Sequence, residues 1–295
     1  MLNLKRILRI TALISILLTL GCKSEKPLYN GPDYIMFCTE SQRFGVVNNE
    51  DWFEVVVSAT RPAERDRYIG VEILPLESNA IEGLHYELES NTLCIKAGEM
   101  TTAVRIKGLA DNIYINEELN ITLSLVLDDD NIWEEYGTKT SVTLQRCCEF
   151  DINTFAGYAV LTSTWCMQYM NVESRLVKSH VDTQEEGVIV IEDMFYKDYD
   201  IRIKLHSEDI LNPIANLCGE QVVGSTGEAF GTIYGSGELL LTEPIGYTSY
   251  YGTCEKFLVL YSLIYVEEVG TVGTYVNIFE WVSDDEAERL LREGF

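Results

Sequence analysis

The sequence is poor in positive charge. Its 22 lysine and arginine residues face 47 aspartate and glutamate residues, which gives a formal net charge of −25 at pH 7. Binding to nucleic acid requires clustered lysine and arginine side chains that displace counterions from the phosphates. The charge balance therefore excludes nucleic acid as a partner. It also argues against a polybasic patch for anionic membranes, so any membrane attachment should be through a lipid.

The sequence also lacks the motifs of common catalytic and cofactor sites. Its three histidines, His85, His180 and His206, are far apart and have neither metal-site nor triad spacing. Residues 235–237, Gly-Ser-Gly, do not fit the nucleophile elbow, which needs Gly-x-Ser-x-Gly at a strand-to-helix turn. A glycine-rich nucleotide loop is absent. We therefore expect no catalytic residue, no enzyme activity and no cofactor.

The cysteines do not form a Cys-x-x-Cys pair, and we expect no metal site because tetrahedral sites need clustered ligands. Cys147 and Cys148 are adjacent, so on a strand their side chains would face opposite ways and should not share a partner. We expect most cysteines after residue 22 to be buried apolar thiols. Their number is odd, so at least one stays free or pairs between chains. They are Cys38, Cys94, Cys147, Cys148, Cys166, Cys218 and Cys254.

An uncharged apolar run lies at the N-terminus. It covers residues 10–20, follows a basic segment that contains Lys5 and Arg6, and ends at Gly21 and Cys22. This is the layout of a secretory signal peptide. The run is far shorter than the roughly 20 residues that a membrane-spanning helix needs. The sequence therefore predicts export rather than a transmembrane helix.

The end of this run resembles the lipobox of bacterial lipoproteins, although Thr19 stands where that family prefers leucine. The resemblance implies a signal peptide over residues 1–21, a lipid on Cys22 and a tether over residues 22–32. Several acyl chains on one cysteine anchor a protein stably. The resemblance to bacterial lipoproteins also implies that the protein is anchored to the outer membrane, either at the cell surface or on the periplasmic face. The alternative is a secreted protein in which Cys22 forms a disulfide.

Residues 33–146 have the pattern of a β-sandwich. Leucine and isoleucine alternate with polar residues over 119–127, which predicts a strand with one buried face. Shorter strand patterns occur at residues 53–57, 71–74 and 102–107, with turn residues between them. Helical periodicity is missing, and about seven short strands in this length are typical of a sandwich.

Three short motifs in this region resemble the Calx-β type of immunoglobulin-like domain. They are Glu-Gly-Leu-His-Tyr at residues 82–86, Ala-Gly-Glu at 97–99 and Asn-Glu-Glu-Leu at 116–119. The resemblance implies an immunoglobulin-like sandwich, with Gly98 in a tight hairpin. His85 stands where the family has aspartate, so calcium binding does not follow from the resemblance.

An acidic segment, Asp128 to Glu135, is the remaining candidate for a calcium site. Its carboxylates offer the oxygen ligands that hard cations prefer. The segment lacks the glycine and the spacing of an EF-hand loop. We favour a solvated acidic loop between two strands, and calcium remains the alternative.

Residues 150–295 predict a second all-β domain. Strand patterns over 158–161, 187–191, 199–205, 238–241, 257–266 and 275–281 indicate an antiparallel meander or a small β-barrel. Ser283 begins a capping box for a short helix that ends near Glu293. The Tyr-Gly pair at 234–235 and Val-Gly-Thr-Val-Gly at 269–273, expected before the final strand, resemble C-terminal modules of Bacteroidota lipoproteins. That resemblance implies a calycin-like barrel.

A loop over residues 246–252 carries Tyr247, Tyr250 and Tyr251, which are the candidate ligand-binding residues. Tyrosine combines a flat apolar face with a polar tip, which suits sugar rings or protein partners. The alternative is that these rings only pack over the end of the barrel.

We therefore expect a lipid-anchored envelope protein that acts as a non-catalytic binding or accessory module in glycan capture, with a glycan or another envelope protein as partner. The alternative is a calycin-type barrel that holds a small apolar ligand in a lumen walled by Ile189, Ile201 and Ile203. A hydrolase that uses two carboxylates is a third possibility, and a deep acidic cleft would favour it.

Overall fold

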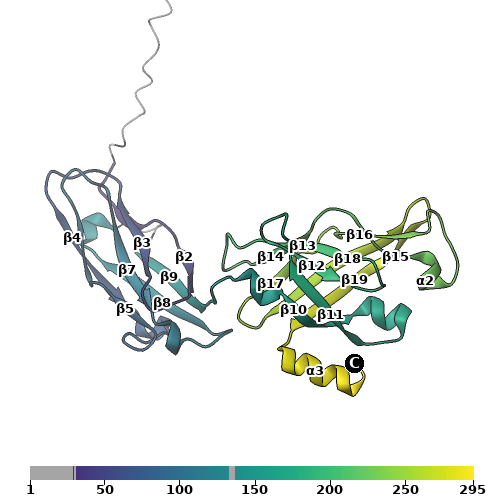
Figure 1. Ribbon diagram of the computed structural model, residues 1–295. Coiled ribbons are helices and arrows are strands. Elements are labelled where there is room, and N and C mark those ends of the chain that lie inside the picture. The colour runs from purple at the N-terminus through teal and green to yellow at the C-terminus, as the bar shows by residue number, and fades with distance from the viewer. Residues whose placement is uncertain (1–28, 30, 133–136) are drawn as a thin grey trace, which may run out of the picture.

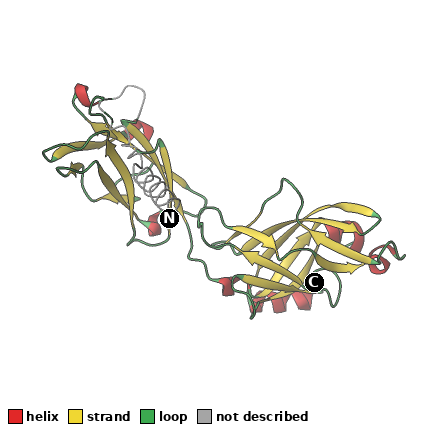
Figure 2. Ribbon diagram, turned by 90° about the horizontal axis from the view of Figure 1, so that it is seen from above, coloured by secondary structure: helices red, strands yellow, loops and turns green. Residues whose placement is uncertain are grey.

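The computed structural model describes residues 29, 31–132 and 137–295 (Figure 1). Strands dominate two regions that follow each other along the chain, and the helices lie at their periphery (Figure 2). The predicted signal peptide 1–21, Cys22 and most of the predicted tether 22–32 lie outside the described residues. Within the described part of the chain, no helix is long and apolar enough to cross a membrane.

The first region is a sandwich of two sheets. The four-stranded sheet has the order β1-β3-β7-β5, and the five-stranded sheet has the order β2-β9-β8-β4-β6. Strands β2 and β9 run parallel, and the other pairings between these strands are antiparallel. The strands are β1 Ile35–Phe37, β2 Ser41–Val46, β3 Trp52–Ala59, β4 Arg67–Ile73, β5 Tyr86–Leu88, β6 Thr92–Ile95, β7 Thr101–Gly108, β8 Glu118–Val126 and β9 Lys139–Arg146. Short 3₁₀ turns lie at Pro75–Glu77, Ala110–Asn112 and Asp129–Asn131.

Alternating side chains fill the space between the two sheets. In β8 the residues Leu119, Ile121 and Leu123 are buried, whereas Asn120 and Ser124 on the opposite face are partly exposed. This is the predicted period-2 pattern, because successive side chains of a strand point to opposite faces. The immunoglobulin-like sandwich expected from the sequence is therefore confirmed.

The turn at Gly98 differs from the prediction. Gly98 has a positive φ of 81°, which glycine adopts without steric cost, and the amide of Glu99 donates to the carbonyl of Lys96 at 2.9 Å. However, β6 belongs to the five-stranded sheet and β7 to the four-stranded sheet. The turn therefore carries the chain from one sheet to the other, and the predicted hairpin is wrong. A tight turn motif specifies the local bend but not which strands pair.

The second region is an eight-stranded antiparallel barrel. The barrel closes because β19 pairs with both β10 and β18. A further hairpin, β15 and β16, extends the wall beyond β18. The strands are β10 Gly157–Ser163, β11 Ser174–Val181, β12 Val188–Glu192, β13 Ile201–Leu205, β14 Ile214–Leu217, β15 Gln221–Ser225, β16 Glu238–Thr242, β17 Ser249–Gly252, β18 Phe257–Val266 and β19 Gly270–Trp281. Residues 270–273 thus belong to the final strand, whereas the sequence placed them before it.

Helical segments cover the ends and one side of the barrel. Helix α3, Asp284–Glu293, begins after Ser283, whose hydroxyl accepts a hydrogen bond from the amide of Glu286, so the predicted C-terminal helix is confirmed. Three further segments were not predicted: a 3₁₀ turn at Ile152–Phe155, the π-helix η5 at Cys166–Met170 and the short helix α2 at Thr226–Phe230. Ser225 and Glu228 form the capping box of α2.

The barrel interior is packed with side chains. Ile189, Ile201 and Ile203 point inward and are fully buried, in one cluster with large aromatic residues such as Trp165 and Phe279. The three isoleucines line none of the cavities described below. The structure therefore does not support the alternative in which an apolar ligand occupies an empty lumen.

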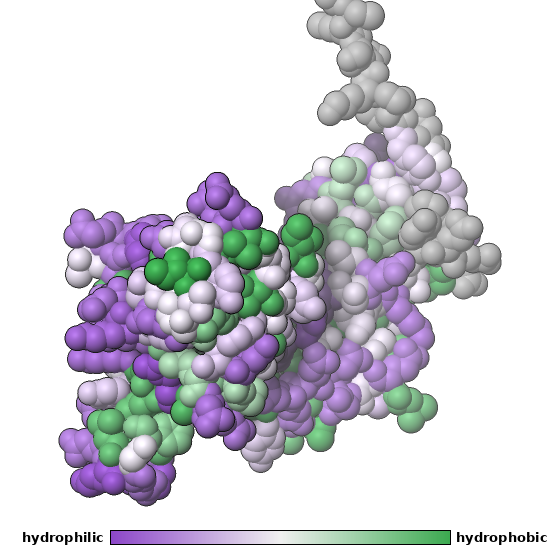
Figure 3. Space-filling model, turned by 90° about the vertical axis from the view of Figure 1, so that its right-hand side faces the viewer, coloured by the Kyte–Doolittle hydropathy of each residue, from purple (hydrophilic) through white to green (hydrophobic). Residues whose placement is uncertain are grey.

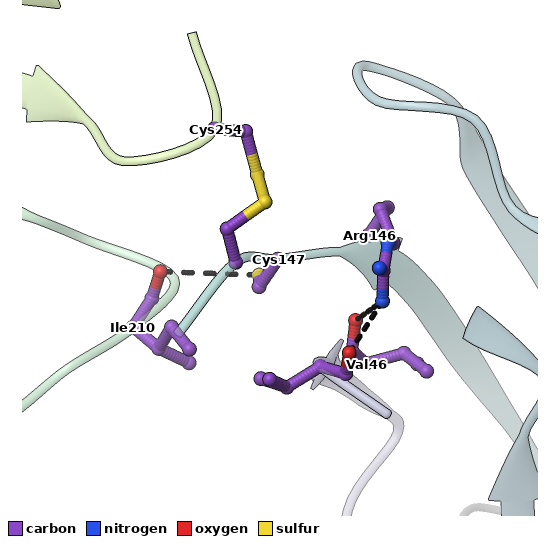
Figure 4. The surroundings of a disulfide bond; sticks show 7 residues. Val46, Arg146, Cys147, Ile210 and Cys254 are labelled. Atoms are coloured by element: carbon purple, nitrogen blue, oxygen red, sulfur yellow. Dashed lines mark hydrogen bonds between the residues drawn. A yellow bond between two sulfur atoms is a disulfide. The ribbon is translucent and has the colours of Figure 1, made fainter. Parts of the chain in front are cut away.

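A short linker joins the two regions and is fixed to the barrel. Cys148 forms a disulfide with Cys254 in the β17–β18 turn, across 106 residues of sequence (Figure 4). Its neighbour Cys147 remains a thiol, and the Sγ atom lies 3.9 Å from the carbonyl oxygen of Ile210. The two adjacent cysteines therefore have different partners, as predicted. Cys166 is also a buried thiol, but Cys38 is exposed, contrary to the general expectation of burial.

Candidate functional site

The largest described cavity is a cleft where the sandwich, the linker and the barrel meet, and it is called the junction cleft below. Its volume is about 470 Å³. Domain interfaces are a preferred place for ligand sites of this size. The sandwich contributes the turn after β2, and the barrel contributes the β13–β14 and β17–β18 loops. The lining residues are Val47, Asn48, Asp51, Glu149, Phe150, Ser207, Ile210, Pro213, Tyr251 and Thr253.

The turn after β2 holds the Asp51 carboxylate in place. The side-chain amide of Asn48 donates to Oδ2 of Asp51 at 2.8 Å. In turn, Oδ1 of Asn48 accepts from the backbone amides of Glu50 and Asp51, at 2.7 and 3.1 Å. Asparagine favours this kind of turn because its side chain bonds to the backbone that follows. The sequence after β2 therefore presents a pre-positioned acceptor to the cleft.

The linker provides a second carboxylate. Glu149 directly follows the disulfide-bonded Cys148, and its side chain is exposed to solvent. Among the described residues it has no hydrogen-bond or ion-pair partner, so both of its oxygens are available to a ligand. The lining contains no lysine, arginine or histidine. The junction cleft therefore suits neutral or positively charged ligands and disfavours phosphates, sulfates and other anions.

Two aromatic rings form the apolar side of the junction cleft. The rings of Phe150 and Tyr251 lie 5.7 Å apart at 58°, and Phe155 meets Tyr251 edge-on at 5.3 Å from inside the barrel. The hydroxyl of Tyr251 donates to the backbone carbonyl of His206 at 2.8 Å. Burial, with a smaller contribution from the Glu208 carboxylate, raises the pKa of Tyr251 to about 12. The ring is therefore neutral and fixed in position at physiological pH.

The disulfide closes one side of this junction. A smaller cavity of about 180 Å³ lies beside the linker and is lined by Cys147, Cys148 and Cys254 among others. It shares Ile210 and Tyr251 with the larger cleft. On the sandwich side, a Cβ atom added to Gly45 would lie 2.8 Å from the side chain of Ile210, so the two regions touch here. The junction cleft is therefore built between parts that are held together by a covalent bond and by packing.

The chemistry of this lining matches a polyhydroxylated ligand. Carboxylates and the Asn48 amide accept or donate hydrogen bonds to hydroxyl groups, and Ser207 and Thr253 do both. The partly exposed ring of Phe150 supplies the apolar contact that the carbon side of a sugar ring requires, and the buried Tyr251 ring packs against Phe150. Both carboxylates belong to exposed residues, so the junction cleft is not the deep acidic cleft that a hydrolase would require.

The structure separates the three tyrosines predicted to bind ligand. Tyr251 is 2% exposed and lies in the junction cleft, whereas Tyr247 and Tyr250 are 57% and 43% exposed on the outer barrel wall. Successive residues of β17 alternate between the two faces, which turns Tyr250 outward and Tyr251 inward. A surface made of all three rings is therefore wrong. A binding role for each ring separately stays a prediction.

The outer pair has its own neighbours. Tyr247 packs against Tyr261 with ring centres 5.1 Å apart, and Tyr250 meets Phe257 at 6.0 Å. No described cavity adjoins either ring.

The histidines and the acidic segment do not assemble into a site. His85 accepts from the backbone of Ile81, His180 pairs with Glu192 at 2.9 Å, and His206 lies 3.8 Å from Glu208. No group of three potential metal-ligating side chains occurs within residues 31–132 and 137–295. Asp128 borders a cavity on the sandwich, but residues 134 and 135 of the acidic segment lie outside the described residues. Calcium binding there stays untested.

Sequence reasoning missed most of the junction cleft. Asn48 and Asp51, Glu149, and Ser207 come from three separate segments that only the packing of sandwich on barrel brings together. Two local signals were present: the Asn-Asn-Glu-Asp turn at residues 48–51 and the polar junction that begins at Glu149. Neither signal predicts which barrel loop lies opposite.

Comparison with known proteins gives one family match. Residues 135–293 match a family described as "Domain of unknown function (DUF4984)", which covers the barrel and the last sandwich strand. No curated protein matches the sequence. The apo form of a Calx CBD1 domain is similar to this chain at 16% identity and a TM-score of 0.33, over 39% of this chain and 98% of that one.

Two proteins of Bacteroides species are similar over both regions. One is an auxiliary nutrient binding protein from Bacteroides thetaiotaomicron, at 13% identity and a TM-score of 0.32, over 82% of this chain and 89% of that one. The other is a suggested carbohydrate binding protein from Bacteroides ovatus, at 8% identity and a TM-score of 0.32, over 82% and 74% of the two chains. With TM-scores below 0.5, these similarities do not decide the function.

Proposed function

The chain belongs to the DUF4984 family, and we propose that it is a lipid-anchored envelope protein whose junction cleft binds a neutral glycan without catalysis. One observation carries the binding role. A cavity of about 470 Å³ joins two available carboxylates, an amide and hydroxyls to an aromatic wall, where the sandwich meets the barrel and a disulfide fixes the linker to the barrel. The absence of cationic side chains from its lining favours uncharged sugars over sulfated or uronic ones.

Binding would use each side of the junction cleft differently. The Asp51 and Glu149 carboxylates would accept hydrogen bonds from sugar hydroxyls, and such charge-assisted bonds are stronger than neutral ones. Phe150 would contact the apolar face of the ring. Because Asn48 already fixes Asp51 and the disulfide fixes the linker, little conformational entropy would be lost on binding.

The test is calorimetric titration of the detergent-solubilised protein with neutral disaccharides that score on a glycan array. We expect Glu149→Gln and Asp51→Asn each to weaken binding about tenfold or more, because each removes a charged hydrogen bond worth about 1.5–3 kcal/mol. Glu280→Gln, an equal change of charge at an exposed residue of β19, is the matched control and should bind normally. Glycan binding that is unchanged in the Asp51→Asn, Glu149→Gln double variant would reject the junction cleft as the site.

The anchor is supported by the sequence alone. The basic segment, the apolar run and Gly21-Cys22 together favour lipidation, and lipid attachment would place the glycan site in the envelope. Labelled palmitate should be incorporated into the protein in cells, and Cys22→Ala should abolish incorporation. Protease treatment of intact cells would then distinguish the cell surface from the periplasmic face. Incorporation that persists in Cys22→Ala would reject this cysteine as the lipid site.

A further inference from the structure

A second hollow lies at the end of the barrel remote from the sandwich, and it is called the end groove below. It has a volume of about 370 Å³. Figure 3 looks onto this end of the molecule, where hydrophobic groups gather between polar ones. Segments η5 and α2, the turn after α2 and the β18–β19 turn supply the lining. The lining residues are Tyr169, Phe230, Tyr234, Val266, Val269, Gly270, Thr271 and Val272.

A ladder of aromatic rings leads from the core to the end groove. Fully buried Trp165 lies 4.4 Å from Tyr169, which meets Phe230 at 5.3 Å and 72°. Phe230 in turn meets Tyr234 at 6.0 Å and 67°. Tyr234 is 47% exposed, so the ladder ends at the surface. Edge-to-face pairs of this kind are favourable, and the buried tryptophan fixes the orientation of the outer rings.

The lining of the end groove is uncharged. Its polar atoms are the hydroxyls of Tyr169, Tyr234 and Thr271, and the Tyr169 hydroxyl already accepts from the side-chain amide of Gln168 at 3.1 Å. A ligand that fits must therefore offer an apolar face and hydroxyl groups but no charge. A neutral sugar ring has this combination, and tyrosine has the complementary one.

Strand β18 connects the end groove to the junction. Its first residue, Phe257, lines the smaller junction cavity, and its last residue, Val266, lines the end groove. Nine steps of about 3.3 Å separate these residues, so the end groove lies roughly 30 Å along one wall of the barrel from the smaller cavity, which adjoins the junction cleft. An extended chain of sugars is long enough to reach both.

We propose that the end groove is a second binding site for neutral glycans, and that a long glycan chain engages it together with the junction cleft. The claim that the end groove binds glycans stands by itself. The claim that one glycan chain engages both sites rests on the proposed function of the junction cleft. Binding at one site makes binding at the other intramolecular, which raises overall affinity by factors of 10² to 10⁴ when the linker matches the span. The protein would then prefer polymers to short oligosaccharides.

The first measurement compares disaccharides with decasaccharides of the same neutral β-glucan or α-mannan, by calorimetric titration of the full protein. We expect the decasaccharide to bind at least tenfold more tightly. Tyr234→Ala should remove that gain and leave disaccharide affinity at the cleft unchanged. Tyr68→Ala, which removes a 72% exposed ring on the sandwich, is the matched control and should keep the gain. A gain that persists in Tyr234→Ala, or no gain in the wild type, would overturn the two-site proposal.

The second measurement tests the end groove in a variant whose junction cleft is disabled. Because Trp165 packs directly under Tyr169, we expect the same sugars to change the tryptophan fluorescence of the Asp51→Asn, Glu149→Gln variant, and Tyr234→Ala to remove the part of that change that arises at the end groove. The fluorescence change can be present while calorimetry of the wild-type protein shows no binding that depends on Asp51 and Glu149. In that case the proposed function of the junction cleft is wrong, but the end groove remains a glycan site. If only apolar peptides, and no sugar, change the fluorescence, the end groove is a protein-docking site and the inference is wrong.

Discussion

The sandwich and the barrel fill their cores from different parts of the chain. The sandwich core consists largely of aliphatic side chains on strands, such as Val55, Ile106 and Leu123. The barrel core also takes large rings from segments between strands: Phe155 precedes β10, and Trp165 begins the turn into η5. A barrel has two open ends, and these segments close them. Strand periodicity therefore describes the sandwich core well and describes only the walls of the barrel.

The strongest test of this difference is removal of the barrel's central ring. We expect Trp165→Ala to lower barrel stability by about 3–5 kcal/mol, because the cavity that it leaves is surrounded by rings that cannot collapse easily. The sandwich should be unaffected, so calorimetry should show one shifted transition and one unchanged. Leu123→Ala is the reverse control, with a loss of about 2–5 kcal/mol in the sandwich only. Equal shifts of both transitions in either variant would contradict separate cores.

The disulfide should matter to the barrel alone. Cys148→Ser removes a crosslink between residues 106 apart, and loss of a native disulfide typically costs about 2–5 kcal/mol because the unfolded chain gains freedom. Thermal unfolding should show a lower melting temperature for the barrel and an unchanged melting temperature for the sandwich. Cys38→Ser, at an exposed free thiol, is the matched control and should change neither. A sandwich transition that falls together with that of the barrel would show that the crosslink stabilises both.

The two regions also differ in how deeply they bury hydrogen-bonded asparagine side chains. In the barrel, Asn277 accepts from Ser163 at 2.8 Å and donates to Ser262 at 2.9 Å, and all three side chains are buried. Asn277→Leu should cost about 1–3 kcal/mol, because it removes the acceptor of the buried Ser163 hydroxyl and the donor to the buried Ser262 hydroxyl. In the sandwich, Asn120 bonds to the carbonyl of Glu77 but stays partly exposed. Asn120→Leu should therefore cost less, and chemical denaturation that gives equal losses would contradict this.

The smallest expected effect concerns one carboxylate in each region. The backbone amide of Gln184, and then Arg202, lower the pKa of Asp182 in the barrel, and the amide of Ala97, and then Lys96, lower that of Asp66 in the sandwich. A pKa that folding lowers contributes stability above the unfolded-state pKa of about 3.9, and that contribution is lost as the pH falls through the folded value.

Asp182→Asn should therefore destabilise the barrel slightly at pH 7, and the difference from wild type should shrink as the solution is acidified. Asp66→Asn should do the same in the sandwich. The Asp66 carboxylate is open to solvent, so screening keeps its effect small, whereas the Asp182 side chain is 10% exposed and should show the larger of the two effects. Unfolding curves recorded from pH 7 down to pH 2 check this, and a difference that grows toward low pH would contradict the assignment.

Much of the fold was predictable because it follows from local chemistry. The alternation at Leu119, Ile121 and Leu123, the inward set Ile201 and Ile203, and the cap at Ser283 each gave the correct element. The errors occurred where the outcome depends on a partner elsewhere in the chain. Gly98 specified a turn but not the two sheets that it joins, and the helix α2 that Ser225 caps was not predicted.

The candidate site was less predictable than the fold. Tyr251 was singled out for an exposed loop, yet it lies inside because the register of β17 places it toward Phe155. Asp51 and Glu149 were two carboxylates among 47, and the turn and the junction in which they lie do not predict that both border one cleft. Their proximity follows from the short linker and from the packing of the Ile210 side chain beside Gly45, where the sandwich touches the barrel.

The two all-β regions and the inward face of most strands follow from side chains a few residues apart, and the acidic charge follows from composition. The closure of the barrel by β19 with β10 and β18, the pairing of Cys148 with Cys254, the junction cleft and the end groove depend on how the folded chain packs. Each of these joins residues that are distant in the chain, and their contacts depend on how complete sheets pack. A local sequence pattern does not predict such contacts between distant residues.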